Sequence, residues 1–127
     1  MENLKYFIPV RTPNPSNSSR GIAFMVRKQH REQHKRGKEF TTLHLDDQGF
    51  LSPKDFPKVK RVRLCRICPG NGLDGHDNLR SALKWVVDGI AEALATDDAK
   101  IKWDYTQRRG TPKEYGVEVE IQWRKQK

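Results

Sequence analysis

Residues 73–98, with the sequence LDGHDNLRSALKWVVDGIAEALATDD, decide the fold because they hold the clearest helical pattern in the chain. Apolar side chains recur there at the spacing of one broad helix face, at Leu79, Ala82, Leu83, Val86, Val87, Ile90, Ala93 and Leu94. The opposite side is polar and carries Asp77, Ser81, Lys84 and Asp88. Asp77 or Asn78 is a suitable N-cap. The pattern predicts an amphipathic helix over residues 77–95, with acidic residues at both of its ends.

Shorter patterns on either side of this helix predict four strands and a second helix. The strands are expected at residues 4–10, 59–67, 100–108 and 115–123, and a strongly basic helix at residues 22–40. The last two strands alternate apolar and polar side chains around a Gly-Thr-Pro turn, so we expect them to form an antiparallel hairpin. The order β-α-β-α-β-β predicts one α+β domain over residues 1–127, with a small mixed sheet and helices mainly on one face. Residues 11–20 are expected to be a Pro/Ser/Asn-rich loop, and residues 41–56 an irregular connection.

The chain is strongly basic, with 25 Lys and Arg against 16 Asp and Glu, a net charge of +9 and a pI of about 9.8. Such an excess suggests a polyanionic partner, because each cation placed on a phosphate releases a counterion. The candidate DNA-binding residues lie on the basic helix and on the strand at residues 59–67; they are Arg27, Lys28, Arg31, Lys35, Arg36, Lys60, Arg61 and Arg63. The alternative for the basic helix is an ordinary solvated face. Its apolar residues lie at its start, so its second half is expected to project over solvent or DNA.

Neither a membrane span nor a zinc site is expected. No apolar run approaches the roughly 18 residues that a membrane-spanning helix needs, and the N-terminal segment lacks the layout of a signal peptide, so we expect a cytoplasmic protein. Cys65 and Cys68 would need a second ligand pair to bind zinc. His30 and His34 are four residues apart, a spacing equally typical of an exposed helix face. On a strand, the two cysteines would point to opposite faces.

The acidic residues are grouped rather than scattered, notably at Asp74 and Asp77 and at Asp97 and Asp98. Grouped carboxylates within a basic protein are what a metal-dependent nuclease needs. A hard cation such as Mg²⁺ prefers carboxylate oxygens and retained waters, and it activates water for attack on a phosphodiester.

The order Asp-Asn-Leu, amphipathic helix, Asp-Asp-Ala and strand resembles the RusA-type Holliday-junction resolvases of bacteriophages and prophages. Here Asp77-Asn78-Leu79 and Asp97-Asp98-Ala99 carry the resemblance. Further matches are Asn14-Pro15-Ser16-Asn17 and the final alternating strand. The chain departs from the family pattern at Gly75, where the family has an Asp, and at Ser81, where it has a Lys. Our hypotheses are that Asp74 replaces the missing carboxylate and Lys84 the missing cation.

The resemblance implies a homodimeric endodeoxyribonuclease of DNA recombination and repair, which cuts four-way junctions by paired nicks. It implies Mg²⁺ as the cofactor, with Mn²⁺ as a substitute, and a bacterial cell as the setting. The metal ligands would be Asp74, Asp77 and Asp98, with Lys84 neutralising charge on the phosphate. Asp97 and His76 are additional candidates.

Helix geometry limits how these residues meet. A straight helix over residues 77–95 would place Asp97 and Asp98 roughly 30 Å from Asp77. Either the helix ends or bends early, near Gly89, or the second acidic pair serves the partner subunit's site. The alternative function is a non-catalytic protein, either a RusA-like chain that only binds branched DNA or an RNA-associated basic module.

Overall fold

The predicted order of elements is confirmed in a computed structural model, which describes residues 2–12, 23–56, 58–69, 76–96 and 100–123. The strands and helices follow one another as β1 (Glu2–Ile8), α1 (Ala23–Asp47), the short 3₁₀ helix η2 (Pro53–Asp55), β2 (Val59–Cys68), α2 (His76–Ala93), β3 (Lys102–Arg109) and β4 (Gly116–Trp123). The fold is α+β, with a mixed four-stranded sheet and two long helices. Neither long helix is apolar enough to cross a membrane.

The sheet has the strand order β1-β4-β2-β3, which corrects the expectation of a hairpin between the last two strands. β3 pairs with β2 in parallel, and β4 lies between β1 and β2, antiparallel to both. The reason lies in burial: β4 alternates deeply buried side chains with more exposed ones, whereas β3 is partly or fully exposed along its whole length. The strand with the stronger apolar face takes the central position, and β3 becomes an edge.

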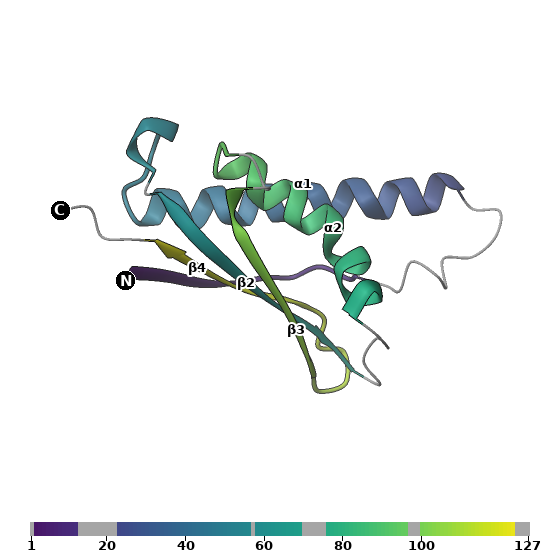
Figure 1. Ribbon diagram of the computed structural model, residues 1–127. Coiled ribbons are helices and arrows are strands. Elements are labelled where there is room, and N and C mark those ends of the chain that lie inside the picture. The colour runs from purple at the N-terminus through teal and green to yellow at the C-terminus, as the bar shows by residue number, and fades with distance from the viewer. Residues whose placement is uncertain (1, 13–22, 57, 70–75, 97–99, 124–127) are drawn as a thin grey trace.

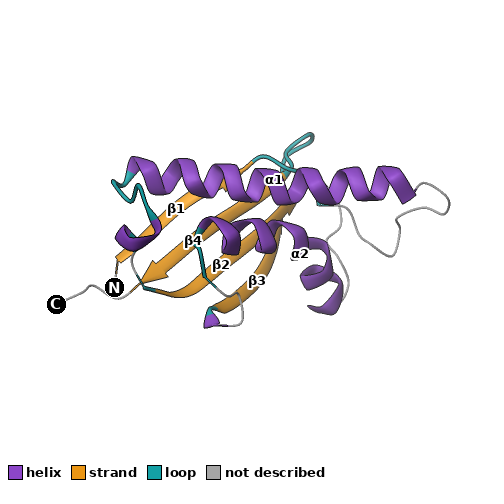
Figure 2. Cartoon of the chain, turned by 90° about the horizontal axis from the view of Figure 1, so that it is seen from above, coloured by secondary structure: helices purple, strands orange, loops and turns teal. Residues whose placement is uncertain are grey.

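Both long helices cover the same face of the sheet (Figures 1 and 2). The core lies between these two layers and includes Ile8 from β1, Leu64 from β2, Leu83 and Ile90 from α2, and Ile121 from β4. The apolar face predicted for α2 is the face that is buried, while Ser81 and Lys84 are exposed on its other side. No helix of the described residues covers the other face of the sheet (Figure 1).

Helix α1 is longer than predicted, since it continues to Asp47 and takes in the first part of the connection assigned to residues 41–56. It also does not project away from the protein in its second half: Gln33, Gly37, Thr41 and Leu45 are buried along one stripe at four-residue spacing. Most of that stripe is polar or small, so hydrophobic periodicity could not reveal it. The helix ends at a turn in which Gly49 has a φ of 88°, a conformation that favours glycine.

The two helices approach closely at two glycines. A Cβ atom at Gly37 would lie 2.7 Å from the Val86 carbonyl oxygen, and one at Gly89 would overlap the His34 carbonyl oxygen. Gly89 lies inside α2, which continues to Ala93, so the alternative in which the helix ends near Gly89 is wrong. The helix ends four residues later, and Ala95 then takes a left-handed conformation with a φ of 54°.

A buried hydrogen bond between two side chains joins β1 to α1. The Tyr6 hydroxyl lies 2.6 Å from the Thr41 hydroxyl, and the Tyr6 ring stacks on His44 at a centroid distance of 4.8 Å. Burial strongly raises the pKa of the Tyr6 phenol, and the hydrogen bond to Thr41 offsets part of this effect. The folded protein therefore holds the phenol proton more tightly than the unfolded chain does.

We expect Tyr6 to make the protein less stable above pH 10. Because its pKa is raised in the folded state, its contribution is complete below the ordinary tyrosine pKa of about 10 and is lost as the pH rises further. Well above pH 10, the free energy of unfolding should fall by about 1.4 kcal/mol per pH unit from this group. Urea unfolding between pH 9 and pH 11 measures the slope, which should average about 0.7 kcal/mol per pH unit while the unfolded tyrosine titrates, and Tyr6→Phe should reduce it by about that amount. The matched control is Tyr115→Phe; an equal change of slope in both variants would contradict the assignment.

Candidate nucleic-acid interface

A groove of about 940 Å³ is formed between α1 and α2. Five of its lining residues come from one side of α1 and one from α2; they are Arg27, His30, Arg31, His34, Lys35 and Trp85. The α1 residues share that side because they recur at three- and four-residue spacing. None of the six is a carboxylate, so the groove presents a positive surface around an aromatic pair.

The aromatic pair is His30 and Trp85, which stack with their ring centroids 4.6 Å apart and their planes 21° from parallel. The Lys84 ammonium lies 4.8 Å from the centroid of the same indole ring, a cation–π contact. Burial first, and then the Lys84 charge, lower the pKa of His30. The imidazole is therefore mainly neutral at pH 7, and it acts as a flat ring rather than as another cation.

Glu92 connects α2 to α1 beside the groove. Its two carboxylate oxygens lie 2.7 Å from His34 Nε2 and 2.9 Å from Lys38 Nζ. The hydrogen bond that Lys38 donates is the main cause of the lowered pKa of Glu92. Lys38 is thus already engaged by a carboxylate, whereas Arg31 and Lys35 have no carboxylate within ion-pair distance among the described residues.

A second basic region lies where the end of β1 meets α1, in a pocket of about 820 Å³. Two of its cations, Arg66 and Arg36, hold parts of the fold together. The buried Arg66 donates to the Thr12 carbonyl and hydroxyl oxygens at 2.9 and 3.0 Å, and also to the Cys68 sulfur at 3.0 Å. Arg36 bonds to Glu32 and to the Pro9 carbonyl oxygen. We infer that this region ties strand ends to α1.

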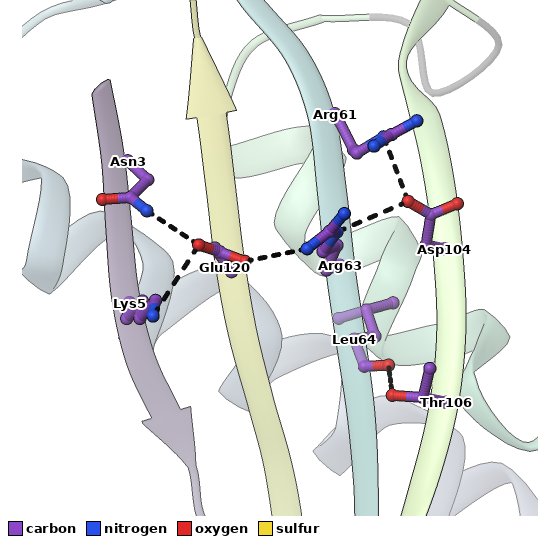
Figure 3. Close-up of polar contacts among 8 residues, drawn as sticks. All are labelled: Asn3, Lys5, Arg61, Arg63, Leu64, Asp104, Thr106 and Glu120. Carbon is purple, nitrogen blue, oxygen red and sulfur yellow. Dashed lines mark hydrogen bonds and ion pairs between the residues drawn. The ribbon is translucent and has the colours of Figure 1, made fainter. Parts of the chain in front are cut away.

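Arg61 and Arg63 lie on the open face of the sheet, away from the helices (Figure 3). The Asp104 carboxylate forms ion pairs with Arg61 at 3.1 Å and with Arg63 at 3.8 Å. Glu120 pairs with Arg63 at 3.8 Å and with Lys5 at 3.9 Å, so a row of alternating charge crosses all four strands. Lys60 is exposed on β2. The eight predicted DNA-binding residues therefore do not form one surface: Arg27, Arg31 and Lys35 share the groove, Lys28 and Arg36 line the second pocket, and Arg61 and Arg63 face the other way.

The predicted catalytic carboxylates are only partly covered by the described residues. Asp74, Gly75, Asp97 and Asp98 lie outside them. His76 and Asp77 lie in the first turn of α2, and their side chains are likewise outside the described part. Lys84 is seven residues beyond Asp77, which places it about 10 Å further along the helix axis. Because α2 begins at His76, Asp77 occupies the first turn of the helix rather than the N-cap position.

Within the described residues, no group of three or more His, Cys, Asp or Glu side chains is arranged to hold a metal ion. Cys65 and Cys68 are both free. They point to opposite faces of β2, as expected: Cys65 is paired in register with Glu118 on the open face, and Cys68 accepts Arg66. His30 and His34 have separate partners, Trp85 and Glu92.

Sequence reasoning did not identify Trp85 as a functional candidate. It falls between the apolar face of α2 and Lys84, where a hydrophobic pattern assigns it to neither side. The available signal was the pair of a boundary aromatic residue on one helix and a run of cations on the other, but only the packing of the helices brings them together.

Comparisons with known proteins do not place the chain in a family. No protein-family model matches it, and no curated protein sequence matches it. One solved structure that is weakly similar is the 2C-methyl-D-erythritol 2,4-cyclodiphosphate synthase of Plasmodium vivax, with 11% sequence identity and a TM-score of 0.32 over 73% of this chain. The chain spans about half of that protein, 52% of its length.

Proposed function

We propose that this protein is a Mg²⁺-dependent endodeoxyribonuclease that resolves four-way DNA junctions by paired nicks. The carrying observation is that α2 carries both the motif Asp77-Asn78-Leu79 and Trp85, which completes a basic, aromatic groove with α1. Trp85 lies about 12 Å along the α2 axis from Asp77. A strand that leaves the groove toward the N-terminal end of α2 would reach the first turn of that helix.

The ligand chemistry suits the proposed metal. Asp74, Asp77 and Asp98 are hard oxygen donors, the type that Mg²⁺ prefers, and Mn²⁺ accepts the same set. When bound, the ion would polarise the phosphoryl group and lower the pKa of a bound water. Asp77 would hold the ion at the start of α2, and Lys84 would offset charge on the phosphate.

A two-fold dimer suits this substrate, because a four-way junction presents two equivalent strands. It would also address the separation of the acidic residues: α2 alone puts roughly 24 Å between Asp77 and Ala93, so Asp98 would serve the site of the partner subunit. We propose the cytoplasm of a bacterial cell, with a phage or prophage gene, as the setting that the resemblance implies.

We expect cleavage of a labelled four-way junction to require the metal. With Mg²⁺ or Mn²⁺, the protein should introduce paired nicks near the crossover. With EDTA, it should bind the junction without cutting it. A linear duplex of the same length is the control substrate. Binding without cleavage under both metals would contradict the nuclease and support the alternative, a protein that only binds branched DNA or RNA.

A further inference from the structure

The α1–α2 groove differs in two respects from the row of charge on the open face of the sheet. Arg61 and Arg63 in that row each have a carboxylate partner, whereas Arg31 and Lys35 have no such partner among the described residues. The groove also contains a stacked aromatic pair, which a site for duplex phosphates alone would not need.

We propose that this groove binds an unpaired nucleotide of a nucleic acid strand, with the base against the Trp85–His30 pair and the flanking phosphates on Arg31 and Lys35. The proposal rests on the proposed function only in taking a nucleic acid as the partner, and it does not depend on cleavage.

Each part of the groove corresponds to one part of the ligand. Aromatic side chains bind unpaired bases of any sequence through their π faces, and cations along the groove follow the backbone. His30 contributes a mainly neutral ring, since burial lowers its pKa. Lys84 lies over the indole ring and adds a cation close to the base. The volume of about 940 Å³ is open to solvent along the exposed side of α1, where Arg27, Arg31 and Lys35 are exposed.

A base within a duplex is already stacked on its neighbours, so the groove should distinguish single strands from duplexes. At a four-way junction, the groove would hold a base that becomes unpaired at the crossover, about 12 Å along the α2 axis from Asp77. Because stacking and phosphate contact are common to DNA and RNA, the probes should be oligothymidylate, oligouridylate and a short DNA duplex, each with a fluorescent label.

The first test is Trp85→Ala in the full-length chain, with binding measured by fluorescence anisotropy. We expect affinity for both single strands to fall about tenfold or more, while affinity for the duplex changes by less than about twofold. Trp85→Phe keeps an aromatic face and should retain most of the single-strand affinity. Equal single-strand binding by Trp85→Ala and the wild type would overturn the proposal, and so would an equal loss for single strands and duplex.

Because Trp85 is half-buried between the helices, a second test leaves the core untouched. The double variant Arg31→Ala/Lys35→Ala removes two exposed cations. We expect the slope of log affinity against log salt for oligothymidylate to become less steep by about 1.4, since each phosphate contact contributes about 0.7 on a single strand. The matched control is Lys54→Ala/Lys58→Ala, which removes the same charge from exposed positions in the segment between α1 and β2. An equal change of slope in the control would overturn the proposal.

The two proposals can fail separately. If the protein binds single strands through Trp85 but cuts no junction, the proposal for the groove stands and the proposed nuclease activity is refuted. If the protein cuts junctions and Trp85→Ala binds single strands with full affinity, the nuclease proposal stands and the proposal for the groove is refuted.

Discussion

Replacement of Asp77 by asparagine is expected to slow the cleavage of a four-way junction by at least about a thousandfold, while the junction is still bound. Asparagine has nearly the size and shape of aspartate, but its amide is neutral and donates hydrogen bonds on one side. The charge that would hold Mg²⁺ at the start of α2 is lost. Single-turnover cleavage with Mg²⁺ in excess measures the rate, and gel mobility shift in EDTA measures binding.

Asp88→Asn is the matched control, because it removes the same charge from the same helix eleven residues later. Asp88 lies about 16 Å from Asp77 along the helix axis, so it cannot reach the same ion. We expect Asp88→Asn to cleave at close to the wild-type rate. Equal losses in both variants would show that the net charge of α2, and not a metal ligand, controls cleavage. An active Asp77→Asn protein would refute the assignment of Asp77.

The second large effect concerns stability. Gly89→Ala is expected to lower the free energy of unfolding by about 2 kcal/mol or more. Alanine favours a helix interior over glycine by about 1 kcal/mol, so an exposed position would be stabilised by this change. At Gly89 the new methyl group would overlap the backbone carbonyl of His34 and lie 2.8 Å from the backbone nitrogen of Lys38. A backbone cannot rotate aside as a side chain can, so the two helices must separate.

Chemical unfolding in urea tests this, with Ser81→Ala on the exposed side of the same helix as the control. Ser81→Ala should be neutral or stabilising by a few tenths of a kcal/mol. Gly37→Ala should also destabilise, but less, because its closest contact, the Val86 carbonyl oxygen, is 2.7 Å away. If Gly89→Ala were as stable as Ser81→Ala, the close approach of α1 and α2 would be wrong. Gly89→Ala should also disrupt the groove between α1 and α2, because the groove and the stability of the protein both depend on the close contact of these two helices.

Local patterns were sufficient for the elements of this fold. The apolar stripe of α2 and the alternation in β4 each specify a face to be buried, and both faces are buried as predicted. The strand order was not predictable in this way, because alternation shows that a strand is half-buried and not which neighbours it has. β3 and β4 are adjacent in sequence but not in the sheet.

The length of α1 and the groove escaped prediction for a related reason. Thr41 is fully buried through a hydrogen bond with Tyr6, so a polar residue occupies a core position that a hydrophobic pattern leaves out. The Trp85–His30 contact depends on how closely the helices approach, and two glycines determine that distance. For the metal site, the residues come from a family resemblance, and Asp77 remains its most direct test.

The central position of β4 has a consequence for how the protein is made. Asn3 on β1 and Glu120 on β4 are hydrogen-bonded across 117 positions of sequence, and β1 has no other strand beside it. During synthesis, β1 emerges early and must wait for β4, with its backbone donors and acceptors unpaired in the meantime. Pairing at such long range is slow, and a waiting strand is open to pairing with another chain. The polar Asn3 and Lys5 side chains on the exposed face of that strand are well suited to keeping it in solution until its partner arrives.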